Sequence, residues 1–301
     1  MTDRVETVRR DRSPLLQKGE KVEVSGWVEE KRKLGMFFWL AFSWLVILIV
    51  AAIAVYFLPF KDPLEQNYDA LYAPFSAEHW LGCDMYGRDL LSRILYGASV
   101  SLRVACTSPF IGMTIGLILG MMAGYFRGKI DSFVSIFIDS ILAFPNIVLA
   151  IAVLFYAGAT MTNLILVISF YTIPQFTRIA RANTILYAQR DFVLAAHAQG
   201  ASHFRILYRE LFPNIFVPLA AFSLLIMSFT IVLEGGLSFL GVGLPPPTPT
   251  WGRMIADGIE GLADDPKIVF IPSLFMFLTI LALNLIGDRL RAFTDVKASN
   301  A

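Results

Sequence analysis

Long apolar segments are the feature that most constrains how this chain can fold. Of its 301 residues, 56% are hydrophobic and only 16% are charged, whereas soluble domains carry about 25% charged residues. A helix needs about 20 apolar residues to cross the hydrocarbon core of a bilayer, and an open strand edge cannot face lipid. The sequence therefore predicts an all-α, polytopic membrane protein. Six transmembrane helices are expected, at about residues 34–58, 100–126, 133–156, 163–182, 211–240 and 268–286, the fourth interrupted by Pro174.

The distribution of Lys and Arg predicts the side of the membrane that each loop occupies. Six spans place both termini on one side, and cytoplasmic loops carry an excess of Lys and Arg. With the termini inside, 19 of the 25 Lys and Arg residues fall on the cytoplasmic side. We therefore expect both termini in the cytoplasm. The predicted parts are a cytoplasmic segment 1–33, a first span 34–58, an external loop 59–99, a core of five spans 100–290 and a cytoplasmic tail 291–301.

Two external loops have distinctive sequences. The end of the first loop, LGCDMYGRDLLSRILYG, predicts a short amphipathic helix at the membrane interface, with Asp84 as a cap of the preceding turn. Its apolar face would be formed by Leu90, Leu91, Ile94 and Leu95. The second loop, GVGLPPPTPTWG at 241–252, contains four prolines and favours an extended polyproline conformation.

A polar stretch rich in small residues, DFVLAAHAQGASHFRILYRELFPN at 191–214, separates two spans on the predicted cytoplasmic side. It divides at Gly200, after which Ser202 is expected to cap a second helix. The apolar face of that helix would hold Phe204, Leu207, Tyr208 and Leu211. The small residues leave room for another protein to approach the backbone; the simpler alternative is a solvated loop between spans.

Several motifs resemble one family of transporters. The pattern AAxxxGA, followed about a dozen residues later by PN, resembles the EAA loop of permeases from ATP-binding cassette (ABC) importers. LGCDMYGRDLLSRILYGASVSL, FRGKIDSFVSIFIDSILAFPNIVLAI, LEGGLSFLGVGLPPPTPTWGRMI and NLIGDRLR resemble segments of the dipeptide/oligopeptide branch. Together these motifs cover about residues 80–290. The chain is thus similar to the "C"-type permease subunit of that branch.

The resemblance implies a type I ABC-importer permease fold and a set of partners. These are a second homologous permease subunit, two ATPase subunits, an extracytoplasmic peptide-binding protein and membrane lipids, in a bacterial or archaeal plasma or inner membrane. Nucleic acid is not expected. A coupling helix at about 191–204 would dock into the ATPase. The residues expected to make that contact are Ala195, Ala196, Gly200, Ala201 and Arg205.

The sequence departs from the family pattern at three places. Leu194 replaces the Glu of the EAA triplet, Cys83 replaces a Thr, and the tail reads AFTDV. Leu194 argues against a coupling role for a carboxylate at that position, so we expect coupling to depend on packing.

Two acidic residues fall within predicted spans, where a charge is costly and often functional. Asp139 is a candidate for the translocation path, or a structural partner of Arg127 or of an arginine in the coupling loop. Glu234 would either contact the peptide's ammonium group or brace an outer gate.

Other classes of protein are less consistent with the sequence. No phosphate-binding loop is present, because GYFRGKI lacks the required spacing, so no ATP site is expected on this chain. The resemblance implies that partner ATPase subunits bind ATP and Mg²⁺ and that this chain carries no cofactor. Cys83 and Cys106 form no metal or disulfide pattern, and the three histidines have no ligand spacing. No catalytic residue is therefore expected. The alternatives left open are an importer of nickel chelates, glutathione or antimicrobial peptides, and an ion-coupled secondary transporter.

Overall fold

Helices make up the regular structure of the described part of the chain. The structure, a computed structural model, describes residues 35–299, with the backbone alone for 293–299. The chain divides into two units, Met1–Gly35 and Met36–Ala301, and the predicted segment 1–33 lies outside the described residues. Within the described range, the strand-like pairing is limited to an isolated antiparallel bridge between Cys83 and Asp89. The predicted all-α fold is confirmed.

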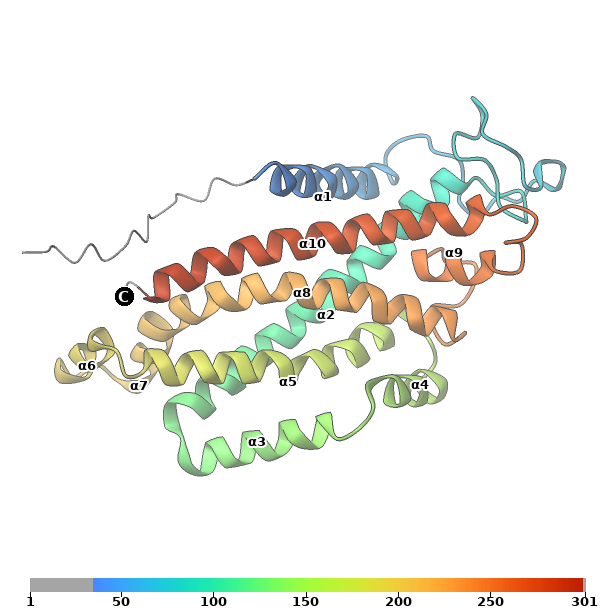
Figure 1. Cartoon of the computed structure of the whole chain (residues 1–301). Helices are drawn as coiled ribbons and strands as arrows, with labels where there is room; N and C mark the ends of the chain where they lie inside the picture. The colour runs from blue at the N-terminus through green and yellow to red at the C-terminus, as the bar shows by residue number, and fades with distance from the viewer. Residues whose placement is uncertain (1–34, 300–301) are drawn as a thin grey trace, which may run out of the picture. The chain divides into compact units, whose positions relative to one another are not determined.

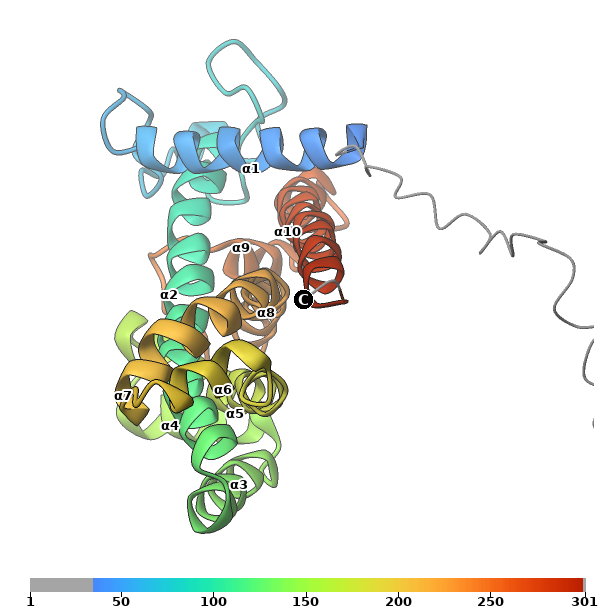
Figure 2. The same cartoon turned by 90° about the vertical axis from the view of Figure 1, so that its left-hand side faces the viewer.

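The helices of the second unit form a bundle with short helices at both ends (Figure 1). In chain order they are α1 (Met36–Ala54), the 3₁₀ turn η1 (Tyr68–Ala70), α2 (Leu90–Phe126), α3 (Gly128–Leu142), α4 (Asn146–Ala157), α5 (Met161–Tyr187), α6 (Asp191–Ala198), α7 (His203–Arg205), the π-helix η2 (Ile206–Leu211), α8 (Phe212–Phe239), α9 (Trp251–Gly258) and α10 (Lys267–Ser299). We name the two ends of the bundle the α6 end and the α9 end. Seen from the α6 end, α1 lies across α10 (Figure 2).

Four helices of the described residues are long and apolar enough to cross a membrane, and α3 with α4 makes a fifth if the bent pair is one span. The four are Met36–Ala54, Leu90–Phe126, His203–Phe239 and Lys267–Ala292. The predicted fourth span corresponds to α5, which is long enough but less apolar. Its buried surface includes hydroxyl side chains that donate hydrogen bonds to carbonyls of the same helix, those of Ser169, Thr172, Thr177 and Thr184.

Two prolines have opposite effects on predicted spans. The third span, predicted as one helix over 133–156, is broken into α3 and α4, which are bent by 78°. Pro145 lies at the break, where its ring disfavours helical conformation in the preceding residue. Pro174, expected to interrupt the fourth span, instead lies inside the unbroken helix α5. Membrane helices tolerate proline where neighbouring groups and local adjustments satisfy the freed carbonyl.

The predicted interfacial helix is the first part of α2. One helix of 37 residues runs from Leu90 to Phe126, so it is about 55 Å long, well beyond the ~30 Å of hydrocarbon. Asp89 caps α2 by accepting hydrogen bonds from the Ser92 backbone N–H at 2.8 Å and the Ser92 hydroxyl at 2.8 Å. The loop predicted over 59–99 therefore ends at Asp89. Asp84 caps the preceding turn, as predicted, because its Oδ1 accepts hydrogen bonds from the Tyr86 and Arg88 N–H groups at 2.8 and 3.0 Å. At the other end of the chain, α10 extends past the predicted limit at 286 to Ser299.

Glycines at every fourth position of α2 create its contact with α5. Gly112, Gly116, Gly120 and Gly124 face α5 in the same order as residues 172, 176, 180 and 184, so the two helices are parallel. A Cβ added to Gly120 would lie 2.5 Å from the Ala180 Cβ and 2.6 Å from the Thr177 carbonyl oxygen. Small residues at this spacing allow the backbones of membrane helices to approach closely. The repeat of glycines at every fourth position is visible in the sequence, but the helix contact was not predicted from it.

We predict that Gly120→Ala destabilises the protein by about 1–3 kcal/mol, because the new methyl group overpacks a contact with backbone atoms. The matched control is Gly236→Ala in α8, where an added Cβ meets nothing within 4 Å. There we expect no loss, or a gain of up to about 1 kcal/mol from helix propensity. Thermal unfolding of both purified variants in detergent would measure the difference. Equal melting temperatures would contradict the proposed importance of the α2–α5 contact.

Candidate functional site

The stretch between α5 and α8 has the predicted helix–turn–helix form. Helix α6 ends at Ala198, and Gly200, two residues later, has a φ of +77°, a left-handed conformation that favours glycine. The Gly200 N–H donates to the His197 carbonyl at 2.9 Å and the Ala201 N–H to the Ala196 carbonyl at 3.0 Å, a pattern that closes the helix. The Ser202 hydroxyl accepts a hydrogen bond from the Arg205 N–H and caps α7. The predicted break at Gly200 and cap at Ser202 are therefore confirmed.

The predicted apolar face of the second helix is correct only in part, because residues 206–211 form a π-helix. Of its four residues, Leu211 is buried and Leu207 half-buried, whereas the other two are not. In a π-helix the hydrogen bonds join residues i and i+5, so the buried residues are Ile206 and Leu211, both 0% exposed. Phe204 and Tyr208 lie outside, 77% and 67% exposed, with their rings stacked. A sequence pattern based on 3.6 residues per turn cannot anticipate this change of phase.

The residues predicted to contact an ATPase lie on two sides of this loop. Ala195, Gly200 and Arg205 are exposed, whereas Ala196 and Ala201 are half-buried against an apolar cluster that includes Val193 and Leu211. Nothing lies within 4 Å of a Cβ added to Gly200. The loop thus has an anchored side and a free side, and Leu194, 55% exposed, is also on its surface.

Two histidines that looked unrelated in the sequence meet at one hydroxyl group. The Tyr125 hydroxyl at the end of α2 lies 3.1 Å from His197 Nε2 and 2.8 Å from His203 Nδ1. These contacts attach α6 and α7 to α2. Among the described residues, no group of three or more His, Cys, Asp or Glu side chains could hold a metal ion. Sequence spacing could not reveal this cluster, because one member lies more than 70 residues away.

Glu234 is buried near the α9 end and is hydrogen-bonded on both carboxylate oxygens. It is 1% exposed and accepts hydrogen bonds from the hydroxyls of Ser238 at 2.9 Å, Thr250 at 2.8 Å and Ser101 at 3.3 Å. Thr250 also caps α9, and Ser101 accepts a hydrogen bond from the Trp251 N–H. The carboxylate therefore connects α2, α8 and α9. This arrangement favours bracing of the α9 end over direct substrate contact.

Asp139, the other candidate acid, is paired on the surface of the chain. Its Oδ1 accepts a hydrogen bond at 2.8 Å from Nη2 of Arg178 in α5, and the side chains are 64% and 60% exposed. The partner is therefore Arg178 and not Arg127. A second ion pair joins the same two helices closer to the α6 end, where Arg181 donates two hydrogen bonds to Asp131 at 2.5 and 2.7 Å.

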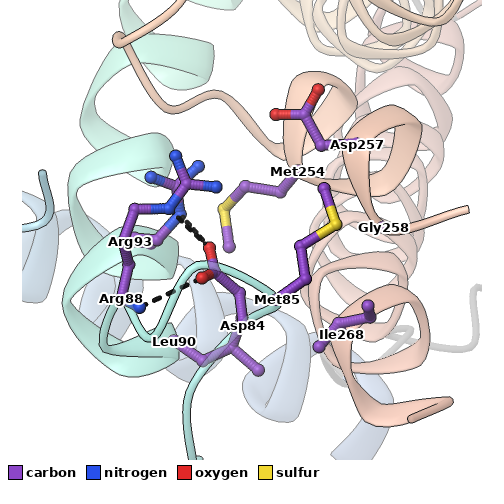
Figure 3. Close-up of a pocket in the computed structure, with 9 residues that line it drawn as sticks. All are labelled: Asp84, Met85, Arg88, Leu90, Arg93, Met254, Asp257, Gly258 and Ile268. Atoms are coloured by element: carbon purple, nitrogen blue, oxygen red, sulfur yellow. Dashed lines mark hydrogen bonds and ion pairs between the residues drawn. The ribbon is translucent and has the colours of Figure 1, made fainter. Parts of the chain in front are cut away.

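A pocket at the α9 end is lined by two aspartates and two arginines, and one of the aspartates pairs with both arginines (Figure 3). Asp84 pairs with Arg88 at 2.7 Å and with Arg93 at 3.4 Å. Burial raises the pKa of Asp257 above its usual value, against the opposing effect of Arg253 at 2.7 Å. The lining residues are Asp84, Met85, Arg88, Leu90, Arg93, Met254, Asp257, Gly258 and Ile268. The Asp84–Arg93 contact joins the loop before α2 to the first turn of that helix.

Cys83 and His79 contribute to structure in the same region. Cys83 is fully buried, and burial raises the pKa of its thiol to about 11, so it remains protonated at neutral pH. Cys106 is an exposed free thiol on α2. His79 Nδ1 lies 2.9 Å from the Asp89 carboxylate, the cap of α2. These residues supply no nucleophile with an adjacent base.

Comparison with known proteins places this geometry among transport permeases. Residues 116–299 match the family described as "Binding-protein-dependent transport system inner membrane component". The chain is 38% identical to "Glutathione transport system permease protein GsiD" of Pectobacterium atrosepticum, and 37% identical to that of Escherichia coli. Both alignments cover 84% of this chain and 84% of the relative. The fold resembles a chain of the inward-facing MetNI methionine ABC transporter, with a TM-score of 0.55, 17% identity, and coverage of 68% of this chain and 96% of that one.

We predict that Glu234→Ala destabilises the protein by at least about 2 kcal/mol, because three buried hydroxyls lose their acceptor and each unsatisfied group costs about 1–3 kcal/mol. The control is Ser228→Ala in the same helix, where the buried hydroxyl bonds only to the Leu224 carbonyl. Its effect should stay below about 1 kcal/mol, the net value of one hydrogen bond. Denaturation curves of the detergent-purified variants would decide; a Glu234→Ala variant as stable as the control would exclude the bracing role.

Proposed function

This chain belongs to the family of inner-membrane components of binding-protein-dependent transport systems, and from that premise we propose that it carries short peptides of glutathione size. It is a permease subunit of an ABC importer. In our proposal it forms half of a translocation path that a second, homologous permease subunit completes. The observation that supports this cargo is the 38% identity to a glutathione permease over 84% of both chains. Glutathione is itself a tripeptide, so this cargo agrees with the peptide branch that the sequence motifs resemble.

The α6–α7 loop is our proposed contact with the ATPase subunits. Its anchored side is held to the bundle through Val193 and Leu211, and its free side presents Ala195, Gly200 and Arg205. A small, exposed surface on a fixed support is suited to transmit a displacement from a partner to α5 and α8. ATP and Mg²⁺ would be bound by the ATPase subunits. The exposed Leu194 is consistent with a contact based on packing.

The α9 end is our proposed external side. The excess of Lys and Arg in loops and segments assigned to the opposite side supports this orientation, with both termini in the cytoplasm. The external loop 59–89 exposes large aromatic side chains, among them Tyr68, Phe75 and Trp80. It would receive an extracytoplasmic binding protein that delivers the peptide. Membrane lipids would cover the exposed apolar side chains of α1.

Reconstitution of the complete importer would test this function. The chain would be copurified with its second permease subunit and two ATPase subunits, placed in liposomes with ATP, and supplied with loaded binding protein. We expect vanadate-sensitive uptake of labelled glutathione and of a labelled dipeptide. Uptake of neither peptide, with ATP hydrolysis intact, would refute the proposed cargo. Uptake driven by an ion gradient without ATP would refute the proposed energy source.

We predict that Gly200→Trp lowers peptide uptake per ATP hydrolysed by at least about tenfold. The chain itself has room for the new side chain, since a Cβ there meets nothing within 4 Å, so the clash would be with a docked ATPase. The matched control is Gly158→Trp, because Gly158 also has a positive φ of +88° and open surroundings but lies between α4 and α5. This control also carries backbone strain, about 1–3 kcal/mol, because the φ of 88° and ψ of 142° at Gly158 lie in a region essentially restricted to glycine. Equal coupling in the two variants would remove the docking role of the loop.

A further inference from the structure

Arg178 and Asp139 form an exposed ion pair between α5 and α3, the helices that correspond to the predicted fourth and third spans. Asp139 lies 11 residues after Gly128, the start of α3, and Arg178 lies nine residues before Tyr187, the end of α5. At 1.5 Å per residue the two are about 16 Å and 14 Å from the α6 end of their helices. The hydrocarbon core is ~30 Å thick, so the pair lies at a depth where lipid would otherwise surround it.

Charged side chains at this depth rarely face lipid; they face the bundle interior or a water-filled cavity. On α3, the exposed neighbours Ile136 and Phe137 are apolar and Ser140 is polar, so the pair belongs to a small polar group on a largely apolar surface. Such a surface, with a few placed polar groups, is the usual composition of a ligand-binding site.

The second ion pair between the same helices shows that clamping α3 to α5 does not require Arg178. Arg181 holds Asp131 through two hydrogen bonds, and these side chains are 37% and 20% exposed. Arg178 and Asp139 share a single hydrogen bond and are 60% and 64% exposed. Most of the hydrogen-bonding capacity of the Arg178–Asp139 pair therefore remains available to a ligand.

The break between α3 and α4 provides a second observation. Asp139 is one turn from the end of α3, after which the chain bends by 78° and α4 begins at Asn146. Discontinuous helices of this kind commonly form the substrate sites of membrane transporters. The ion pair and the break therefore lie together on one exposed side of the chain.

We propose that Arg178 and Asp139 line the translocation path and bind the two termini of a zwitterionic peptide, Arg178 the carboxylate and Asp139 the ammonium group. This inference rests on the proposed function and adds the site of recognition. In the empty path each charge neutralises the other. When a zwitterionic peptide binds, two ion pairs, one at each peptide terminus, replace the Arg178–Asp139 pair. No charge is therefore left unpaired in a region of low dielectric constant at any stage.

Water access to the pair is the first test. Arg178→Cys would be introduced in a Cys83→Ser/Cys106→Ser background of the assembled importer in liposomes. A charged, membrane-impermeant thiol reagent should label this cysteine in the assembled importer. The control is Ile47→Cys on α1, 65% exposed but expected to face lipid, which should stay unlabelled. A cysteine at 178 that reacts in the isolated chain but not in the assembled importer would place the pair at a subunit interface and overturn the proposal.

Peptide chemistry is the second test. Because a hydrogen bond to a charged group would be lost, Arg178→Gln should reduce the preference for a free dipeptide over its C-terminal amide by at least about tenfold. Asp139→Asn should reduce the preference over the N-acetylated peptide to a similar extent. Each variant would be compared with Arg181→Gln, which breaks the more buried pair and should leave both preferences unchanged.

The outcomes separate this inference from the proposed function. If the unmodified importer takes up no peptide, the proposed function fails. If it takes up peptide and the Arg178→Gln and Asp139→Asn variants keep both preferences, the recognition site fails alone. If the pair were purely structural, exchanging its charges in an Asp139→Arg/Arg178→Asp variant would restore the ion pair and leave the peptide selectivity unchanged. Our proposal instead requires altered selectivity in that variant.

Discussion

The close contact between α2 and α5 determines where most of the other groups lie. Four glycines on α2 remove the side chains that would otherwise separate the two backbones. The position of α5 in turn sets Arg178 and Arg181 opposite the acids of α3, and sets the point at which the chain enters α6. Without a hydrophobic driving force between helices in lipid, such packing is a principal source of association. The fold therefore depends on residues that have no side chain.

Sequence patterns predicted the membrane class, most helix positions and the turn at Gly200, because hydrophobicity and glycine conformation are local properties. They did not predict the break at Pro145 or the continuity of α5 through Pro174, because each proline's effect depends on what surrounds it. The π-helix at 206–211 was not predicted, because the expected apolar face assumed the 3.6 residues per turn of an α-helix. The partners of Glu234 and of Tyr125 come from distant segments, and one sequence carries no record of such contacts.

Charges in this chain fall into two kinds of environment. At the α9 end, Glu234 and Asp84 are enclosed and bonded to groups of the same chain, which makes them parts of the framework. Asp139 and Arg178 are exposed and bonded only once to each other. The same type of residue therefore has a different significance according to burial and the number of partners. Composition alone placed Glu234 and Asp139 in one class, and the structure separates them.

The length of α2 has a consequence for how the protein sits in a bilayer. Between Arg103 and Arg127 the helix carries no Asp, Glu, Lys or Arg, and these 24 steps span about 36 Å, close to the hydrocarbon thickness plus a modest tilt. The two arginines thus mark the boundaries of the lipid tails along this helix. Ser101, the partner of Glu234, lies just beyond the first boundary. A thinner or thicker bilayer would change the position of the lipid headgroups relative to the Glu234 carboxylate. Membrane thickness is therefore expected to influence the α9 end more than the rest of the bundle.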